Sequence, residues 1–288
     1  MLKIKLTEQP NNDNGFAVLL GGFDGLHVGH RRLLACAKTS GLSVGMITII
    51  GGKEENSLFT FEERKEIFKS EGVDCVMELP FVEIKDLSPV EFLSILEAHF
   101  HPKCFVCGED FRFGKHALGT PETIKESTHV RVEVLPLMEI DGEKVSSRRI
   151  KRLVQTGLVE DAERLLGNSF FLIGEVYKDR GVGKTLGFPT ANIPYPQEKC
   201  ALKKGVYETR VSVDGKTYKG ITNYGARPTF ADETVVTETY LDGFKGDLYG
   251  RTLKIEFVRY LRDIAKFEDV SALTKQLKED IRRVRTND

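Results

Sequence analysis

Apolar runs and amphipathic stretches alternate along the first part of the chain, up to about residue 166. Short apolar runs predict β-strands at 16–20, 44–50, 73–78, 103–107 and 130–135. Two of the helices between them have clear start signals, because 60–63 and 88–91 both have the spacing of a capping box. Strands that alternate with helices are typical of a parallel sheet with right-handed crossovers. The pattern predicts an α/β, Rossmann-like N-terminal domain with its ligand at the carboxyl ends of the strands.

The pattern changes after Gly167. Residues 206–213 alternate, with Tyr207, Thr209, Val211 and Val213 on one side and Glu208, Arg210 and Ser212 on the other, and 252–257 alternate in the same way; glycine-rich turns separate such runs. This predicts a small antiparallel β-barrel. A closing helix near 269–285 is expected to cover one barrel surface with a single apolar stripe, made by Val270, Leu273, Leu277, Ile281 and Val284.

Two domains are therefore expected, residues 1–166 and 167–288. The first includes two short linker helices, at 148–156 and 159–166, which glycines terminate.

Composition narrows the functional classes. Of 288 residues, 40% are apolar and 30% charged, and the net charge is −1, which gives no electrostatic case for nucleic acid or an anionic membrane as partner. We find no apolar segment of signal-peptide or membrane-spanning length, and five cysteines form no even framework, so we expect a cytoplasmic protein. Cys104 and Cys107 form a CxxC within an apolar run, which indicates a buried strand rather than half of a zinc site.

The stretch GGFDGLHVGH, residues 21–30, lies between an apolar strand and a helix-compatible run. Glycines at such a turn let the backbone approach a ligand, and the following helix N-terminus attracts anions. His27 and His30 would then donate hydrogen bonds to phosphate oxygens, as nucleotidyl transfer requires. The alternative is an ordinary tight turn with two exposed histidines.

In 23–30 the chain resembles the signature of the bacterial bifunctional riboflavin kinase/FMN adenylyltransferases, the FAD synthetases. The resemblance continues in order through nearly the whole chain, at 108–114, 145–147, 186–192, 223–229 and 246–250. It implies a nucleotidyltransferase-type first domain and a riboflavin kinase-like barrel. It also implies synthesis of FMN and then FAD from riboflavin and Mg-ATP, with these small molecules as the partners of a monomer or weak oligomer.

The resemblance assigns roles in the first half. His27 and His30 stabilise the transferring phosphates, Asp110 and Phe111 contact the flavin, and the residues that hold nucleotide are Gly22, Phe23, Asp24, Gly29, Ser146, Ser147 and Arg148.

In the second half, Gly181, Gly183 and Lys184 have the wrong spacing for a P-loop but could still wrap the ATP phosphates. Thr190 and Asn192 offer hard oxygen atoms two residues apart, which suits Mg²⁺, although a loop-closing turn explains them equally well from sequence alone. By resemblance they hold Mg²⁺ and nucleotide, Glu238 is the general base for the riboflavin 5′-hydroxyl, and Arg262 lies on the flavin side.

The first half departs from the family pattern. Residues 49–54 replace a Pro-His-Pro motif, Asp110 stands where asparagine is frequent, and 146–151 read SSRRIK instead of Ser-Ser-Thr-x-Ile-Arg. Arg148 and Arg149 could still hold a triphosphate at a helix start. In the second half, Ile264 stands where the family usually has an acidic residue. Two alternatives remain open: a riboflavin kinase with a degenerate or reduced-flavin-selective adenylyltransferase domain, and a flavin-binding regulator without turnover.

Overall fold

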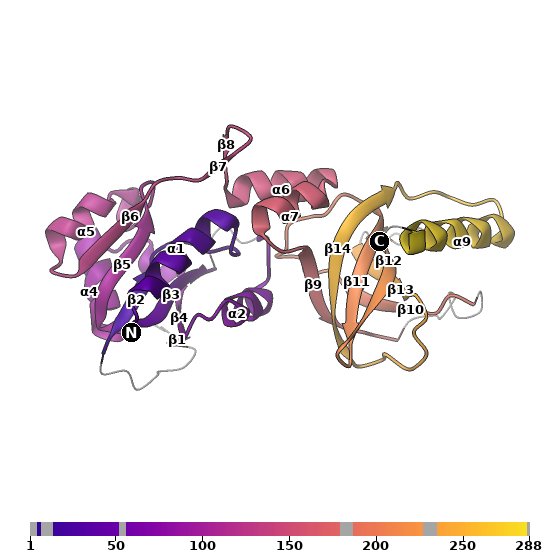
Figure 1. Cartoon of the computed structure of the whole chain (residues 1–288), viewed down its shortest axis with the longest axis horizontal. Helices are drawn as coiled ribbons and strands as arrows, with labels where there is room; N and C mark the ends of the chain where they lie inside the picture. Colours follow the sequence, from indigo (N-terminus) through magenta and orange to yellow (C-terminus); the bar gives the residue numbers. More distant parts are fainter. Residues whose placement is uncertain (1–4, 7–13, 52–55, 179–186, 227–234, 287–288) are drawn as a thin grey trace. The chain divides into compact units, whose positions relative to one another are not determined.

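The computed structural model describes residues 5–6, 14–51, 56–178, 187–226 and 235–286. By internal contacts the chain divides into two compact units, residues 1–149 and 150–288 (Figure 1). Most of the linker-helix region, predicted to belong to the first domain, falls in the second unit by this division. The physical reason is packing, since α7 (Val159–Leu166) contacts two strands of the second sheet.

The first unit contains a six-stranded sheet in the order β1–β4–β3–β2–β5–β6. Its strands are β1 (Lys5–Leu6), β2 (Phe16–Leu19), β3 (Ser43–Ile50), β4 (Cys75–Pro80), β5 (Pro102–Gly108) and β6 (Arg131–Leu135). All pairs are parallel except the one between β1 and β4. The five predicted strands and the parallel sheet are confirmed; the antiparallel edge strand β1 was not predicted.

Helices connect these strands. They are α1 (Val28–Thr39), α2 (Phe61–Ser70), α3 (Phe81–Ile84), α4 (Pro89–Phe100), α5 (Pro121–Ser127) and a short 3-10 helix, η1 (Lys115–Ala117). Both predicted capping boxes are present, at Thr60 and Ser88. A two-stranded hairpin of β7 (Glu139–Ile140) and β8 (Glu143–Lys144) precedes α6 (Ser147–Thr156).

The core of the first unit follows from strand alternation. Phe105 and Cys107 of β5 join a buried cluster with the apolar side of α4, including Phe92 and Phe100. Burial of each such aromatic side chain contributes about 1.5–3 kcal/mol. Cys104 is also buried but lies outside this cluster, so both cysteines of the CxxC lie in a buried strand, as predicted, and both are free thiols.

The second unit contains an antiparallel sheet in the order β10–β13–β12–β11–β14–β9. Its strands are β9 (Phe170–Glu175), β10 (Thr190–Pro194), β11 (Gly205–Val213), β12 (Lys216–Ala226), β13 (Val235–Leu241) and β14 (Thr252–Arg262). The edge regions meet where Tyr177 N–H donates to the Asn192 carbonyl at 3.0 Å. This bridge curls the sheet toward the predicted barrel.

Threonines fill part of the barrel interior. The hydroxyls of Thr209, Thr222 and Thr239 form a buried hydrogen-bonded chain, with oxygen–oxygen distances of 2.9 and 2.8 Å. Because side chains alternate along a strand, Glu238 and Asn223, next to these threonines, project from the opposite face.

The helix α9 (Val270–Thr286) covers that opposite face, where Ile281 and Val284 pack against Val206 and Ile221 (Figure 1). The predicted closing helix is confirmed, but its stripe is shorter than predicted. Val270 is 59% exposed, because the helix packs on the sheet mainly through its C-terminal half.

Candidate active sites

The first candidate site is the turn between β2 and α1. Phe23 has a positive φ of 40°, and its buried ring meets the His30 ring edge-on, with centroids 4.8 Å apart. The Asp24 carboxylate accepts a hydrogen bond from Leu58 N–H at 2.9 Å, which fixes the turn to a neighbouring segment. Gly22 is exposed, and a Cβ on Gly29 would come within 3.2 Å of the His27 ring. The turn therefore has little freedom around the histidines.

The two histidines are stacked at the start of α1. His27 caps the helix, because its Nδ1 accepts from His30 N–H at 3.2 Å, and the His30 Nδ1 lies 3.0 Å from the Gly25 carbonyl. The ring centroids are 3.5 Å apart and the planes differ by 15°.

These contacts assign the ring protons. A nitrogen that accepts carries no proton, so neutral His27 carries its proton on Nε2, where it is free to donate to an anion. His30 must donate from Nδ1 to the carbonyl, which leaves its Nε2 as an acceptor until the ring is protonated.

Both rings are neutral near pH 7. Burial, with smaller contributions from the neighbouring His30 and Lys144, lowers the pKa of His27 to about 2, although a backbone hydrogen bond acts in the opposite direction. Burial likewise lowers the pKa of His30 to about 4, while its contact with the Gly25 carbonyl and the charge of Asp110 act in the opposite direction. The predicted donor to a phosphate oxygen would thus be the neutral His27 N–H rather than an imidazolium.

At the start of α6 the two arginines that were predicted to hold a triphosphate, Arg148 and Arg149, have different surroundings. Ser146 Oγ accepts from Arg149 N–H at 3.3 Å, as expected for a cap. The Arg149 guanidinium donates to the carbonyls of Ile140 and Glu143, at 2.9 and 2.8 Å, and so holds the β7–β8 hairpin. Arg148 is exposed and Ser147 is half-buried. Of the two arginines, only Arg148 is exposed, and its contact with a triphosphate stays a prediction.

The predicted flavin contacts of the first unit lie beside an unpredicted lysine. Asp110 forms an ion pair with Lys144 of β8, and the Phe111 ring stacks on Phe113 with centroids 5.3 Å apart. Lys144 was missed because a lone lysine in a polar hairpin carries no sequence signal. Since Lys144 and Asp110 affect the pKa values of His27 and His30 respectively, all four side chains belong to one electrostatic site.

The second candidate site lies at the edge of the barrel sheet. In the pairing of β10 with β13, Asn192 lies opposite Glu238 and Thr190 opposite Tyr240. The Thr190 hydroxyl donates to Glu238 Oε1 at 2.7 Å. Glu238 is thereby brought to the same face of adjacent strands as Thr190 and Asn192, which precede it by more than 40 positions in the chain.

The oxygen atoms of this group suit Mg²⁺. A hydroxyl, a carboxamide and a carboxylate are hard ligands that leave room for water and phosphate. Among the described residues no group of three or more His, Cys, Asp or Glu side chains could hold a metal. A Mg²⁺ site at Thr190 and Asn192 stays a prediction. The predicted phosphate loop, Gly181, Gly183 and Lys184, lies outside the described residues.

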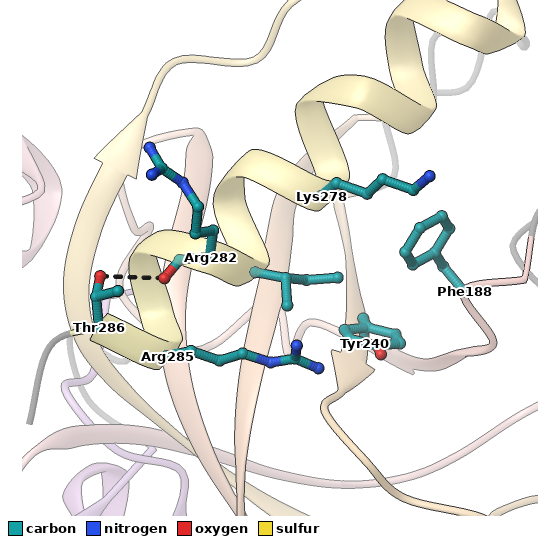
Figure 2. Close-up of a pocket in the computed structure, with 7 residues that line it drawn as sticks. Phe188, Tyr240, Lys278, Arg282, Arg285 and Thr286 are labelled. Carbon is teal, nitrogen blue, oxygen red and sulfur yellow. Dashed lines mark hydrogen bonds between the residues drawn. The ribbon is translucent and has the colours of Figure 1, made fainter.

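A pocket of about 530 Å³ is lined by Tyr240, the strand partner of Thr190, and by Phe188, which comes two residues before Thr190 (Figure 2). Phe188 and Tyr240 form an aromatic wall, with ring centroids 5.7 Å apart. The α9 side of the pocket is basic and includes Lys278, Arg282 and Arg285. Aromatic and cationic groups together suit a ligand that carries both a ring and negative charge.

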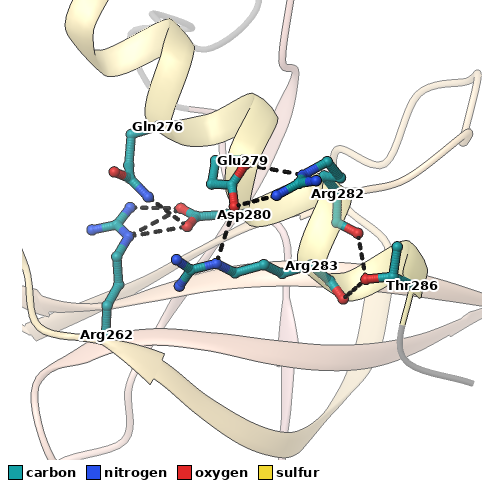
Figure 3. Close-up of polar contacts among 7 residues, drawn as sticks. All are labelled: Arg262, Gln276, Glu279, Asp280, Arg282, Arg283 and Thr286. Atoms are coloured by element: carbon teal, nitrogen blue, oxygen red, sulfur yellow. Dashed lines mark hydrogen bonds and ion pairs between the residues drawn. The ribbon is translucent and has the colours of Figure 1, made fainter.

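Arg262, the predicted flavin-side arginine, is anchored to α9 (Figure 3). Its guanidinium contacts the fully buried Asp280 carboxylate at 2.7 and 3.1 Å to Oδ2 and at 3.2 Å to Oδ1. Gln276 donates to the same carboxylate at 2.9 Å. The pair ties the end of β14 to the closing helix, and a role of Arg262 toward flavin stays a prediction. Asp280 was not predicted, because helical periodicity alone assigns an acidic residue to the solvent side.

Comparison with known proteins gives the same division into halves. Residues 9–149 match the family model described as FAD synthetase, and residues 166–287 match the one described as riboflavin kinase. The bifunctional riboflavin kinase/FMN adenylyltransferase of Bacillus subtilis is 32% identical over 281 residues, which cover 91% of this chain and 89% of that protein. The protein of the same name from Pseudomonas fluorescens is 31% identical and covers 94% and 92% of the two chains.

A solved structure described as the macrolide-efflux protein from Streptococcus pneumoniae is also similar. It superposes with a TM-score of 0.87 at 28% identity and covers 96% of this chain and 95% of that one. In the part of the present chain that the structure describes, no helix has the length and apolar character needed to cross a membrane. From its two matched halves and its full-length relatives, the chain belongs to the bifunctional riboflavin kinase/FMN adenylyltransferase family.

Proposed function

We propose that this chain converts riboflavin to FMN in its second unit and FMN to FAD in its first. The observation that carries the proposal is the presence of two separate polar sites, one in each half that a family model matches. The site with stacked histidines lies in the FAD synthetase half, and the Thr190–Glu238 pair lies in the riboflavin kinase half.

In the kinase step the riboflavin 5′-hydroxyl attacks the γ-phosphorus of ATP, and FMN and ADP are formed. Glu238 accepts the hydroxyl proton, and the hydrogen bond from Thr190 holds its carboxylate in one orientation. Thr190 and Asn192 would hold Mg²⁺, which supplies charge neutralisation for the phosphates. The basic and aromatic pocket beside Tyr240 is suited to part of the nucleotide or flavin.

In the adenylyltransferase step a phosphate oxygen of FMN attacks the α-phosphorus of a second ATP, and pyrophosphate leaves. The attacking oxygen is already anionic, so this step needs positioning and charge stabilisation rather than a base. His27 Nε2–H donates to a phosphate oxygen, and Arg148, with Ser146 and Ser147, contacts the triphosphate. Asp110 and Phe111 contact the flavin.

A kinase with an inactive first unit is the second candidate, because Arg149 is committed to the β7–β8 hairpin and leaves a single arginine at the α6 start. Incubation with Mg-ATP and either riboflavin or FMN, followed by chromatographic separation of the flavins, tests both. We expect FAD from both substrates. FMN as the end product would support the second candidate, and unchanged riboflavin would contradict the proposal and favour a binding protein without turnover.

A further inference from the structure

One row of paired residues crosses five strands of the second sheet. Successive pairings place in this row Asn192 of β10, Glu238 of β13, Asn223 of β12, Val206 of β11 and Arg262 of β14. Directly paired residues of antiparallel strands project from the same face. Asn223 therefore lies on the face of the proposed general base, one strand away from it, or about 5 Å between backbones.

The oxygen atom of the Asn223 carboxamide lacks a hydrogen-bond donor among the described residues. Within the described part of the chain, its Oδ1 is buried and accepts no hydrogen bond. A buried acceptor without a donor is unfavourable, and such atoms in folded proteins usually have a partner. Neither neighbour in the row supplies one, because the Val206 side chain has no polar atom and an ionised Glu238 carboxylate only accepts.

The substrate of the proposed kinase step can supply the missing donor. Riboflavin that presents its 5′-hydroxyl to Glu238 must place the rest of its ribityl chain near that residue. This chain carries further hydroxyls at its 2′, 3′ and 4′ carbons, and each can donate a hydrogen bond. On the other side of Asn223, Val206 is buried against Ile281 and Val284 of α9, so this flank of the carboxamide is apolar.

We propose that Asn223 is a specificity-determining residue that binds the ribityl chain of riboflavin, with its Oδ1 accepting a hydrogen bond from one secondary hydroxyl. The inference rests on the proposed kinase function and assigns the polyol as the part of the substrate that the second unit recognises. It predicts discrimination against flavins that lack this hydroxyl.

The experiment compares riboflavin with its 2′-, 3′- and 4′-deoxy analogues on the full chain and on Asn223→Ala. Affinity is measured by quenching of flavin fluorescence in the presence of Mg-ADP, and kcat/KM is measured for phosphorylation. Thr217→Ala, an exposed change on the same strand and far from the row, is the matched control. Circular dichroism establishes that each variant is folded.

We expect Asn223→Ala to weaken riboflavin binding roughly tenfold to a hundredfold, the effect of an unsatisfied hydrogen-bonding partner. The same substitution should leave the affinity for one of the three deoxy analogues nearly unchanged. Thr217→Ala should change neither the affinity for riboflavin nor the affinity for any of the analogues. Equal losses for riboflavin and all three analogues, or no loss at all, would overturn the proposal. Absence of turnover by the unsubstituted chain would count against the kinase function instead, while the binding comparison would still decide the role of Asn223.

Discussion

Acidification should destabilise the first unit through the stacked histidines. The fold lowers the pKa of His27 to about 2 and of His30 to about 4, both mainly by burial, from an ordinary value of 6.5. Below pH 6.5 both histidines therefore bind protons in the unfolded chain but stay unprotonated in the folded chain until the pH is much lower. The stabilising contribution is fully present above pH 6.5 and is lost as the pH falls toward about 4 for His30 and about 2 for His27.

The size of the effect follows from proton linkage. Between pH 7.5 and 5.5 an unfolded histidine takes up nearly one proton, which lowers the free energy of unfolding by about 1.4 kcal/mol. Over the same pH range the two histidines together should lower the free energy of unfolding of the first unit by about 3 kcal/mol. This corresponds to a loss of roughly a hundredfold in the protection of amides that exchange only when the first unit opens.

Hydrogen exchange followed by mass spectrometry measures this loss at the amides of β2, which lies in the core of the first unit. Protection factors remove the intrinsic pH dependence of exchange. His30→Gln deletes one of the two titrations and should lose only about tenfold over the same range. His129→Gln, at an exposed position in the same unit, is the matched control and should lose as much as the unsubstituted chain. An equal loss in the unsubstituted chain and in His30→Gln would refute the reasoning, because it would mean that His30 already titrates normally in the fold.

Three further predictions concern the other contacts. Thr190→Val removes the hydroxyl that donates to Glu238 and should lower the rate of FMN formation at least about tenfold, with Thr190→Ser retaining most of it; equal rates in the two variants would contradict the positioning role. Asp280→Leu leaves Arg262 without its carboxylate and should lower the free energy of unfolding of the second unit, measured with denaturant, by about 3–5 kcal/mol. The double variant with Arg262→Met should recover most of this loss; no recovery would show that packing, not charge, explains it. Arg148→Ala should raise the KM for ATP in FAD formation roughly tenfold without loss of stability, whereas Arg149→Ala should destabilise the β7–β8 hairpin. The same KM and the same stability in both variants would be inconsistent with the different contacts of the two arginines.

The regular elements could be predicted because short-range patterns decide them. Capping boxes at Thr60 and Ser88 define the starts of two helices, and alternation over 209–213 identifies the buried side of that half of β11, whereas Val206 and Glu208 are buried on the other side as well. The strand β1 was missed, because two residues that pair antiparallel at a sheet edge leave too short a pattern to detect.

The site residues divide in the same way. Motif residues such as His27 and Glu238 could be proposed from sequence, because their local context repeats a family pattern. Lys144, Asn223 and Asp280 could not be proposed, because their significance comes from partners distant in the chain. Strand register places Asn223 beside Glu238, and the packing of α9 places Asp280 against Arg262. Arg149 contacts the β7–β8 hairpin whereas Arg148 is exposed, and this difference also could not be predicted, because the sequence does not reveal where the hairpin lies.

The central claim is that two separate sites, one in each unit, carry riboflavin to FAD in sequence. It is tested most directly by giving riboflavin and Mg-ATP to His27→Ala, to Glu238→Gln and to an equal mixture of both. We predict that the first stops at FMN, that the second leaves riboflavin nearly unchanged, and that the mixture forms FAD because each variant retains the site that the other lacks. A mixture that forms no FAD, under conditions in which the unsubstituted chain does, would contradict the account.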